Sequence, residues 1–134
     1  MSITAHKALI QRLYEEAFNR GDMAVVDEIF SPAFRDNSTP SQVPGVEGVK
    51  SYILAVREGF PDIHVTIEDM IAEADYIAVR TLWRGTHLGT YEGIAPTGKR
   101  VTRTMIQLFS IVDGKIAQEW VEGTGLEQAI RTRE

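Results

Sequence analysis

The stretch Phe60-Pro61-Asp62-Ile63-His64-Val65-Thr66-Ile67 decides the fold, because the spacing of apolar residues changes within it. Before Pro61, apolar side chains recur every three or four residues, which is the period of an amphipathic helix. After it, Ile63, Val65 and Ile67 alternate with polar residues, which is the period of a β-strand. Helices followed by strands predict an α+β fold, a curved antiparallel sheet with helices on one face.

Three helices are expected in the first sixty residues. The first carries an apolar stripe from Leu9 to Phe18 and ends at Asn19-Arg20-Gly21-Asp22, where Gly21 suits a C-cap and Asp22 suits the next N-cap. The second helix is closed by Ser31-Pro32, and residues 35–45 are expected to form a loop. A third helix is predicted from about residue 46 to residue 59.

Four strands are expected after Pro61, at about residues 63–72, 76–84, 101–112 and 115–124. Gly85 to Lys99 carries four glycines and a proline, so this stretch is predicted to be broken or looped. Asp113-Gly114 is the strongest hairpin signal in the chain. Residues 126–130 are expected to add a helical turn.

The long strand around residue 107 is apolar on both faces. Met105, Gln107 and Phe109 share one face, and Ile106 and Leu108 share the other. A strand that is apolar on both faces is covered on both. Helices cover one face, so we expect a second copy of the chain to cover the other and form a homodimer.

Composition excludes several classes of protein. The 134 residues fit one domain, 1–134, and 14 Lys and Arg against 19 Asp and Glu give a net charge of −5, which argues against nucleic acid and anionic membranes as partners. There is no cysteine, and the three histidines lack metal-ligand spacing, so we expect no metal. The apolar stretches are too short to span a bilayer and no signal peptide is visible, so a cytoplasmic protein is expected.

An ordered set of short motifs carries a family resemblance. The pieces are Asn19-Arg20-Gly21-Asp22, Gly59-Phe60-Pro61-Asp62, Gly85-Thr86-His87-Leu88-Gly89, Gly93 to Lys99, and Asp113-Gly114-Lys115-Ile116 with Glu119-Trp120. In this order and spacing, the chain resembles the SnoaL-like polyketide cyclase (ester cyclase) family of the NTF2-like superfamily. The resemblance implies a cone in which the sheet wraps the N-terminal helices around an apolar pocket. It also implies chemistry without a cofactor on a small apolar or polyketide-like ligand.

Two positions depart from the family pattern. The family commonly places an acid/base aspartate four residues after the tryptophan of the last strand, and that position here is Thr124. Family cyclases often carry a histidine after the second helix, where this chain has Asn37. A threonine cannot act unaided as a general base at neutral pH, so the departure at Thr124 bears on the cyclisation chemistry.

The cone predicts one cavity with aromatic walls and a few polar points. The expected lining residues are Tyr14, Phe18, Trp83, Met105, Phe109 and Trp120, with Asn37, Gln107, Arg80 and Thr124 as polar contacts. The alternative for the aromatic residues is that they are plain core. The alternative for Arg80 is a structural ion pair with a carboxylate such as Asp36 or Glu122.

Two side chains are candidates for carrying a proton. His87 titrates near neutral pH, and Glu122 would have a raised pKa if it pointed inward between Trp120 and Thr124. The alternatives are a loop histidine bonded to backbone and a β-bulge that turns Glu122 to solvent.

Three functions follow from these residues. The first is a cyclase that closes a ring by intramolecular aldol addition, with proximity and one acid/base group doing the work. The second is a hydrolase like the epoxide hydrolases of the same superfamily, and the third is a ligand-binding protein without catalysis.

Overall fold

The fold is one five-stranded sheet packed against helices. The computed structural model describes residues 2–38, 43–123 and 125–131. The elements in chain order are α1 (Ile3–Arg12), η1 (Leu13–Phe18), α2 (Met23–Ile29), β1 (Phe30–Asp36), α3 (Gly45–Gly59), β2 (His64–Glu73), β3 (Tyr76–Thr86), β4 (Arg100–Val112), β5 (Lys115–Glu122) and α4 (Leu126–Arg131). The strand order is β1-β5-β4-β3-β2, with β1 parallel to β5 and every other pair antiparallel.

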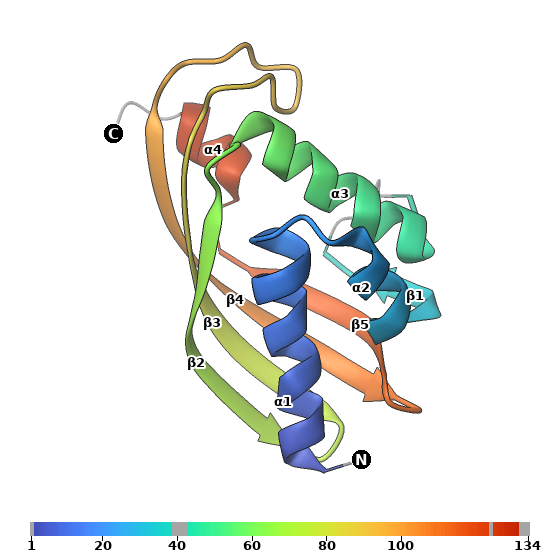
Figure 1. Cartoon of the computed structure of the whole chain (residues 1–134). Coiled ribbons are helices and arrows are strands. Elements are labelled where there is room, and N and C mark those ends of the chain that lie inside the picture. Colours follow the sequence, from blue (N-terminus) through green and yellow to red (C-terminus); the bar gives the residue numbers. More distant parts are fainter. Residues whose placement is uncertain (1, 39–42, 124, 132–134) are drawn as a thin grey trace.

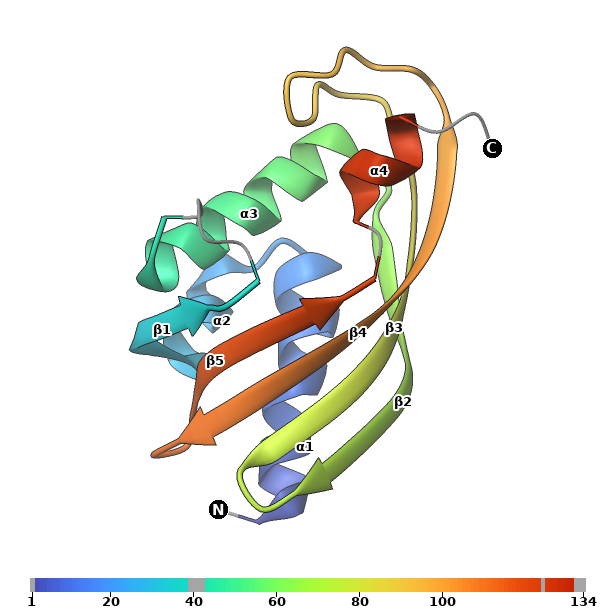
Figure 2. The same cartoon turned by 180° about the vertical axis from the view of Figure 1, so that it is seen from behind.

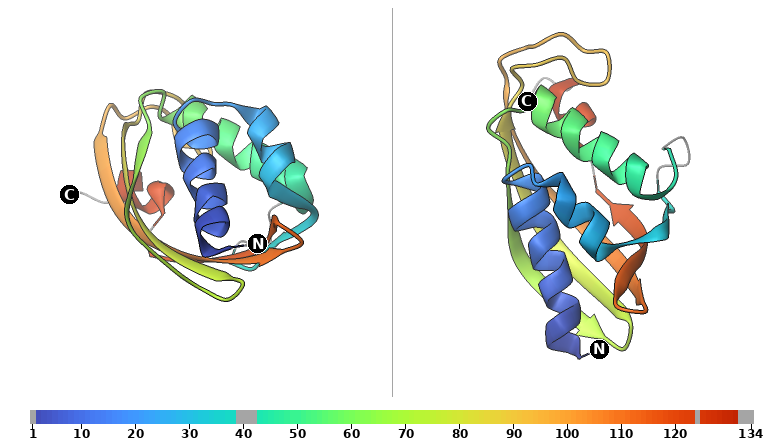
Figure 3. Two further views of the ribbon diagram at one scale, coloured as in Figure 1. Left: turned by 60° about the horizontal axis from the view of Figure 1, so that its bottom comes forward. Right: turned by 45° about the vertical axis from the view of Figure 1, so that its right-hand side comes forward.

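The sheet is curved and the helices lie on its concave side. Figure 1 shows α1 in front of the sheet and α3 crossing near its upper end. Seen along another direction in Figure 3, the sheet bends around α1. Figure 2 shows β2 to β5 from the side opposite α1. The α+β fold with a curved sheet wrapped around N-terminal helices is therefore confirmed.

The helices begin where side chains satisfy their first backbone donors. The hydroxyl of Ser2 accepts from the Ala5 N–H at 3.1 Å, and the carboxylate of Asp22 accepts from the Ala24 N–H at 3.1 Å. Between them, η1 is a π-helical turn in which the Asn19 N–H bonds the Tyr14 carbonyl.

Asn19 fastens the end of this helical segment to the sheet. Its amide nitrogen donates to the Val65 carbonyl at 2.9 Å, and its amide oxygen accepts from the Val65 N–H at 2.7 Å. One side chain thereby replaces a strand neighbour along the free edge of β2. This contact holds η1 against the concave face, which places Tyr14 and Phe18 in the interior.

Residues 30–36 correct the sequence prediction. They form strand β1, although the sequence suggested a helix end at Ser31-Pro32 and a loop from residue 35. Pro32 does not prevent the strand, because β1 is at the edge of the sheet and pairs only with β5. The expected hairpin at Asp113-Gly114 is confirmed, with positive φ angles of 50° and 74°.

The segment between β3 and β4 is docked on the end of α3. The N–H groups of Leu88 and Gly89 both donate to the Gly59 carbonyl, at 3.0 and 3.1 Å. A Cβ at Gly89 would lie 2.1 Å from the Glu58 carbonyl oxygen, so only glycine permits this approach. Within the described part of the chain, no helix is long and apolar enough to cross a membrane.

Gly89→Ala is expected to loosen this docking. The methyl group meets backbone that cannot move without breaking the end of α3, so we expect a loss of about 1–3 kcal/mol in the free energy of unfolding, measured by urea denaturation. Gly125→Ala is the control, because a Cβ there has no neighbour within 4 Å among the described residues. Equal stability of the two variants would contradict the docking.

Candidate active site

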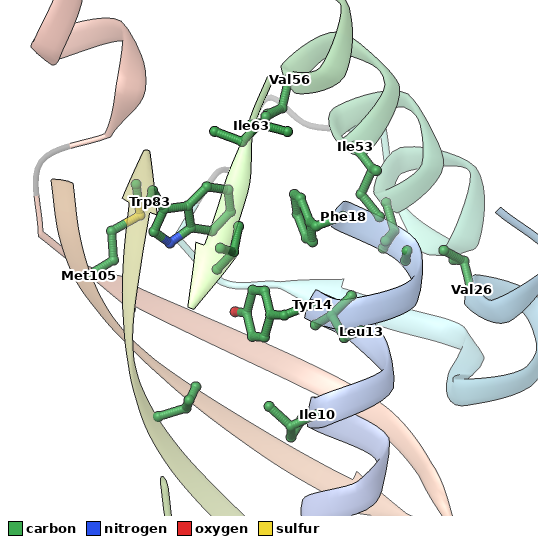
Figure 4. Packing of buried hydrophobic residues seen from close by; sticks show 14 of the residues in the cluster. Ile10, Leu13, Tyr14, Phe18, Val26, Ile53, Val56, Ile63, Trp83 and Met105 are labelled. Carbon is green, nitrogen blue, oxygen red and sulfur yellow. The ribbon is translucent and has the colours of Figure 1, made fainter. Parts of the chain in front are cut away.

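A cavity of about 250 Å³ lies between the helices and the concave face of the sheet. Side chains of η1, β1, α3, β3, β4 and β5 surround it, and apolar and aromatic groups make up most of its wall. Its lining residues are Leu13, Tyr14, Phe18, Phe30, Phe34, Asp36, Ser38, Val49, Tyr52, Trp83, Met105, Gln107, Glu119, Val121, Gly123 and Gly125. Figure 4 shows Tyr14 and Phe18 on the helical side, with Trp83 and Met105 opposite them on the sheet.

Two carboxylates lie side by side in this wall. Asp36 of β1 is the register partner of Glu119 of β5 in the parallel pair, and both side chains line the cavity. Adjacent strands are about 4.8 Å apart, so partners in register bring their side chains close together on one face. The Asn37 N–H to Glu119 carbonyl bond of 2.9 Å and the Val121 N–H to Ser38 hydroxyl bond of 2.7 Å fix this register.

Burial and the neighbouring carboxylate raise the pKa of Glu119 to about 8. Loss of hydration is the larger cause, and repulsion from the charge on Asp36 is the smaller one. The remaining exposure of Glu119 is toward the cavity that it lines. At neutral pH, Glu119 is therefore a protonated acid beside an acidic neighbour.

Two tyrosines complete the polar part of the wall. Burial raises the pKa of Tyr14 and that of Tyr52 well above the usual value, and the charge of Glu119 adds to both shifts. Both phenols consequently stay neutral at any ordinary pH. Tyr52 shares a side-chain hydrogen bond with Tyr91, and both Tyr14 and Tyr52 line the cavity without adding charge.

A chain of hydrogen bonds orients the polar group on the opposite wall. The indole N–H of Trp83 donates to the Thr81 hydroxyl at 2.8 Å, and that hydroxyl lies 3.1 Å from the amide oxygen of Gln107. Because Thr81 occupies the amide oxygen, the amide N–H groups of Gln107 are the donors left to face a ligand. Gln107 is thus suited to hold a carbonyl oxygen.

Five of the predicted lining residues border the cavity: Tyr14, Phe18, Trp83, Met105 and Gln107. Phe109 is fully buried but belongs to the core below the cavity rather than to its wall. Thr124 lies outside the described residues.

Trp120 and Glu122 lie on the outer face, so the inward direction predicted for Trp120 was wrong, and the alternative considered for Glu122, a β-bulge that turns it to solvent, is confirmed. Ser110 pairs with Gln118 and Ile111 pairs with Ile116, which leaves Ala117 as an extra residue in β5. This bulge reverses the alternation of the strand. Beyond it, Glu119 and Val121 point inward, as Ile116 does before it.

Arg80 and Asn37 also lie away from the cavity wall. Arg80 is on the outer face, where its guanidinium binds the Asp69 carboxylate at 2.6 Å, so its role there is an ion pair, although with neither of the partners considered from the sequence. The amide nitrogen of Asn37 donates to the Gln118 side chain at 3.1 Å.

His87 is buried in the segment between β3 and β4, apart from the cavity. Its Nδ1 accepts from the Thr97 N–H at 3.2 Å, and its ring packs on Phe60 with ring centroids 5.5 Å apart. His87 has no exposed surface and does not line the cavity. Of the two predicted proton carriers, neither His87 nor Glu122 reaches the space where a ligand would lie.

Sequence reasoning missed Asp36, Glu119 and Tyr52. In a regular hairpin with Asp113-Gly114 at its turn, Gln118 would pair with Phe109. The Glu119 side chain would then point outward. Asp36 stood in a stretch that was expected to be a loop. A buried Ile116 followed by the polar pair Gln118-Glu119 was the available sign that the alternation breaks within β5.

Among the described residues, no group of three or more His, Cys, Asp and Glu side chains has the arrangement of a metal site. Two carboxyl groups in one wall can serve as an acid and a base when they differ in protonation state.

Comparison with known proteins assigns this architecture to a family. The sequence profile of the SnoaL-like polyketide cyclases matches residues 8–128. The chain belongs to this family. Among curated proteins, it is 28% identical to the aklanonic acid methyl ester cyclase AcmA of Streptomyces galilaeus, over 88% of this chain and 85% of AcmA.

Two solved structures share the whole fold of this chain. TsrD from Streptomyces laurentii superposes with a TM-score of 0.88 at 27% identity, covering 98% of both chains. A SnoaL-like protein from Jannaschia sp. CCS1 has a TM-score of 0.86 at 26% identity, covering 100% of this chain and 98% of its own. The NTF2-like cone expected from the sequence is confirmed by these relatives.

Ionisation of Glu119 is expected to lower the free energy of unfolding as the pH rises. Its pKa is about 8 in the folded chain and near 4.5 when unfolded, so the folded state holds the proton more tightly and loses stability between these two values. Glu119→Gln should remove this dependence and be more stable than wild type by a few kcal/mol above pH 8, measured by urea denaturation across pH 5 to 9.

Glu122→Gln is the matched control, because it makes the same chemical change on the exposed face of the same strand. Its unfolding free energy should follow the wild-type curve with pH. A Glu119→Gln curve parallel to that of wild type would show that Glu119 titrates normally in the folded chain.

Proposed function

We propose that the chain is a cofactor-free cyclase that closes a ring in a polyketide-like ligand by intramolecular aldol addition. The observation that carries the proposal is the pair Asp36 and Glu119, in register on β1 and β5 and facing one enclosed cavity. Two carboxyl groups whose environments separate their protonation states supply an acid and a base at one pH. Membership of the SnoaL-like family supports this reaction class.

In the proposed reaction, Asp36 is the base and Glu119 is the acid. The Asp36 carboxylate takes the proton from the carbon between two carbonyl groups, and the resulting enolate carbon forms the new bond to a second carbonyl carbon. The oxygen of that carbonyl becomes an alkoxide, which takes the proton of Glu119. A proton passing from Asp36 to Glu119 then restores both groups, so no other reactant is consumed.

The remaining wall fits this division of roles. The amide N–H groups of Gln107 suit the carbonyl that becomes the enolate, since donors aimed at a developing negative charge lower the barrier. The aromatic side chains Tyr14, Phe18 and Trp83 hold a flexible ligand in a folded conformation. Proximity and one acid/base pair are enough for an addition within a single molecule.

Asp36→Asn and Glu119→Gln are each expected to lower kcat by about 10² to 10⁴, because each removes one proton-transfer group. The assay follows ring closure of a polyketide ester such as aklanonic acid methyl ester, the compound that names the relative AcmA. Wild-type activity should fall as the pH rises past about 8, where Glu119 loses its proton. In Asp36→Asn, that alkaline limb should move to lower pH if it still appears, since the repelling charge is gone.

Glu122→Gln is the control on the other face of β5 and should keep full activity. Loss of activity in Glu122→Gln or His87→Gln, with Glu119→Gln unaffected, would return the acid/base role to the residues first expected from the sequence. Tight binding of the ester without turnover in any variant would favour a ligand-binding protein.

We also propose that two copies pair through the outer face of the sheet. The register sets Ile71, Ala78, Leu108 and Trp120 in one row across four strands. Ile71 is 70% exposed and Ile106 in the next row is 52% exposed. An apolar row of this length on an uncovered sheet is typical of a surface that another protein covers. We propose separately that the protein is cytoplasmic, as expected from the sequence.

Ile106→Glu is expected to convert a dimer into a monomer, because it places a charge in the centre of the proposed interface. Sedimentation velocity at micromolar concentration measures the change. Leu54→Glu is the control, since Leu54 is 52% exposed on α3, away from the sheet. A wild-type chain that sediments as a monomer would end the dimer proposal.

A further inference from the structure

Among the residues that the structure describes, the cavity lining contains two carboxyl groups and no cationic side chain. Asp36 and Glu119 line it, and none of the described lining residues is Lys, Arg or His. The stretches 39–42 and 124, which adjoin lining residues in the sequence, contain only Thr, Pro, Ser and Gln. No hydrogen bond to the Glu119 carboxylate occurs among the described residues, and its pKa responds only to burial and to Asp36.

Aromatic rings surround the space in front of this pair. Phe18 packs edge-on against Trp83 with centroids 4.9 Å apart and against Tyr52 at 6.1 Å, and Tyr14 meets Trp83 edge-on at 6.0 Å. These rings come from η1, α3 and β3 and all line the cavity. Figure 4 shows Tyr14 and Phe18 on the helical side and Trp83 facing them from the sheet. Aromatic walls with a carboxylate at one end are the usual environment of an organic cation in proteins.

The charge of the carboxylate pair needs compensation beyond the hydrogen bond that the Ser38 N–H donates to Asp36 at 2.9 Å. In the free protein, a proton on Glu119 supplies part of it. A bound cation would supply more, because attraction to a positive group increases in a site from which water is excluded. A bound carboxylate would instead add a third negative group at short range, and the described lining offers no cation to balance it.

We propose that this cavity selects ligands by charge, binding those that place an ammonium group against Asp36 and Glu119 and excluding those with a free carboxylate there. The inference names a class of ligand for the cavity of the proposed function. It rests on that proposal only in placing the ligand in the same cavity. It extends the range of ligands from neutral polyketide esters to amines. It also requires that any acidic substrate arrive with its carboxyl group masked, as an ester or amide.

Proton release is expected to accompany ammonium binding. The groups that face Glu119 are Asp36 from β1, Tyr14 from η1 and Tyr52 from α3, while its partner on β4 is the uncharged Phe109. Both tyrosines remain neutral, so Asp36 and an incoming cation are the charges that act on Glu119. A cation favours the ionised form of Glu119, so binding below pH 8 should release its proton and the affinity should rise with pH up to that value.

The test uses three ligands of similar size and different charge: 2-naphthylmethylamine, 2-naphthylmethanol and 2-naphthoate. Isothermal titration calorimetry at pH 7 should give a dissociation constant for the amine about ten-fold lower than for the alcohol, with no measurable binding of the carboxylate. Repeating the amine titration in two buffers of different ionisation enthalpy measures the released proton.

Asp36→Asn and Glu122→Gln separate the cavity from the surface. The first should reduce the preference for the amine over the alcohol to about two-fold or less, and the second should leave it unchanged. Binding of the alcohol by Asp36→Asn with wild-type affinity shows that the variant is folded and its cavity intact. If Asp36→Asn binds none of the ligands, Glu119→Gln is the second variant, and it should abolish proton release.

Three outcomes overturn the inference: equal binding of the carboxylate and the amine, an amine preference that survives Asp36→Asn, and no binding of any of the three ligands by wild type. The proposed cyclase activity is judged separately by ring closure. Charge selection without turnover leaves this inference standing and rejects the cyclase, whereas turnover without charge selection does the reverse.

Discussion

The parallel pairing of β1 with β5 is the constraint on which the candidate site depends. Without it, Asp36 would belong to a surface loop and Glu119 would be a single buried acid. The pairing places the two carboxylates in register, and the backbone bonds from Asn37 and to Ser38 keep them there. Burial, and to a smaller extent repulsion from Asp36, raises the pKa of Glu119, which is why Glu119 holds its proton at neutral pH. The buried carboxyl pair therefore lowers the stability of the fold, and it keeps an acid and a base together.

The helices form the wall of the same cavity that lies opposite the sheet. Asn19 fixes η1 to β2, and the π-helical turn directs Tyr14 and Phe18 toward Trp83. On the sheet, the hydrogen bonds from Trp83 through Thr81 to Gln107 set the direction of the one amide in the wall. Strands and the π-helical turn therefore position Asp36, Glu119, Gln107 and Tyr14 at the cavity, as a preorganised site requires.

Sequence patterns predicted the architecture well, because hydrophobic period and turn chemistry are local properties. The change of period at Pro61, the helix ends and the Asp113-Gly114 hairpin were all readable from neighbouring residues. Only part of the candidate site could be predicted from the sequence. Four aromatic or apolar wall residues and Gln107 were predicted correctly, but Trp120 was placed on the wrong face. The ion pair of Arg80 and the bulge that turns Glu122 outward were each predicted only as one of two alternatives. A bulge and a parallel edge pairing depend on contacts between distant segments, so the sequence offered the bulge as one possibility and gave no sign of the pairing of residues 30–36.

The extra residue at Ala117 has an evolutionary consequence. Deleting it would leave a regular hairpin in which Gln118 still pairs with Ser110 and Glu119 still pairs with Phe109. Glu119 would keep facing inward, and Trp120 and Glu122 would keep facing outward. The codon of Ala117 can therefore be lost without exchanging the side chains of the pocket with those of the outer surface, so the lineage can shorten this strand while its pocket chemistry is preserved.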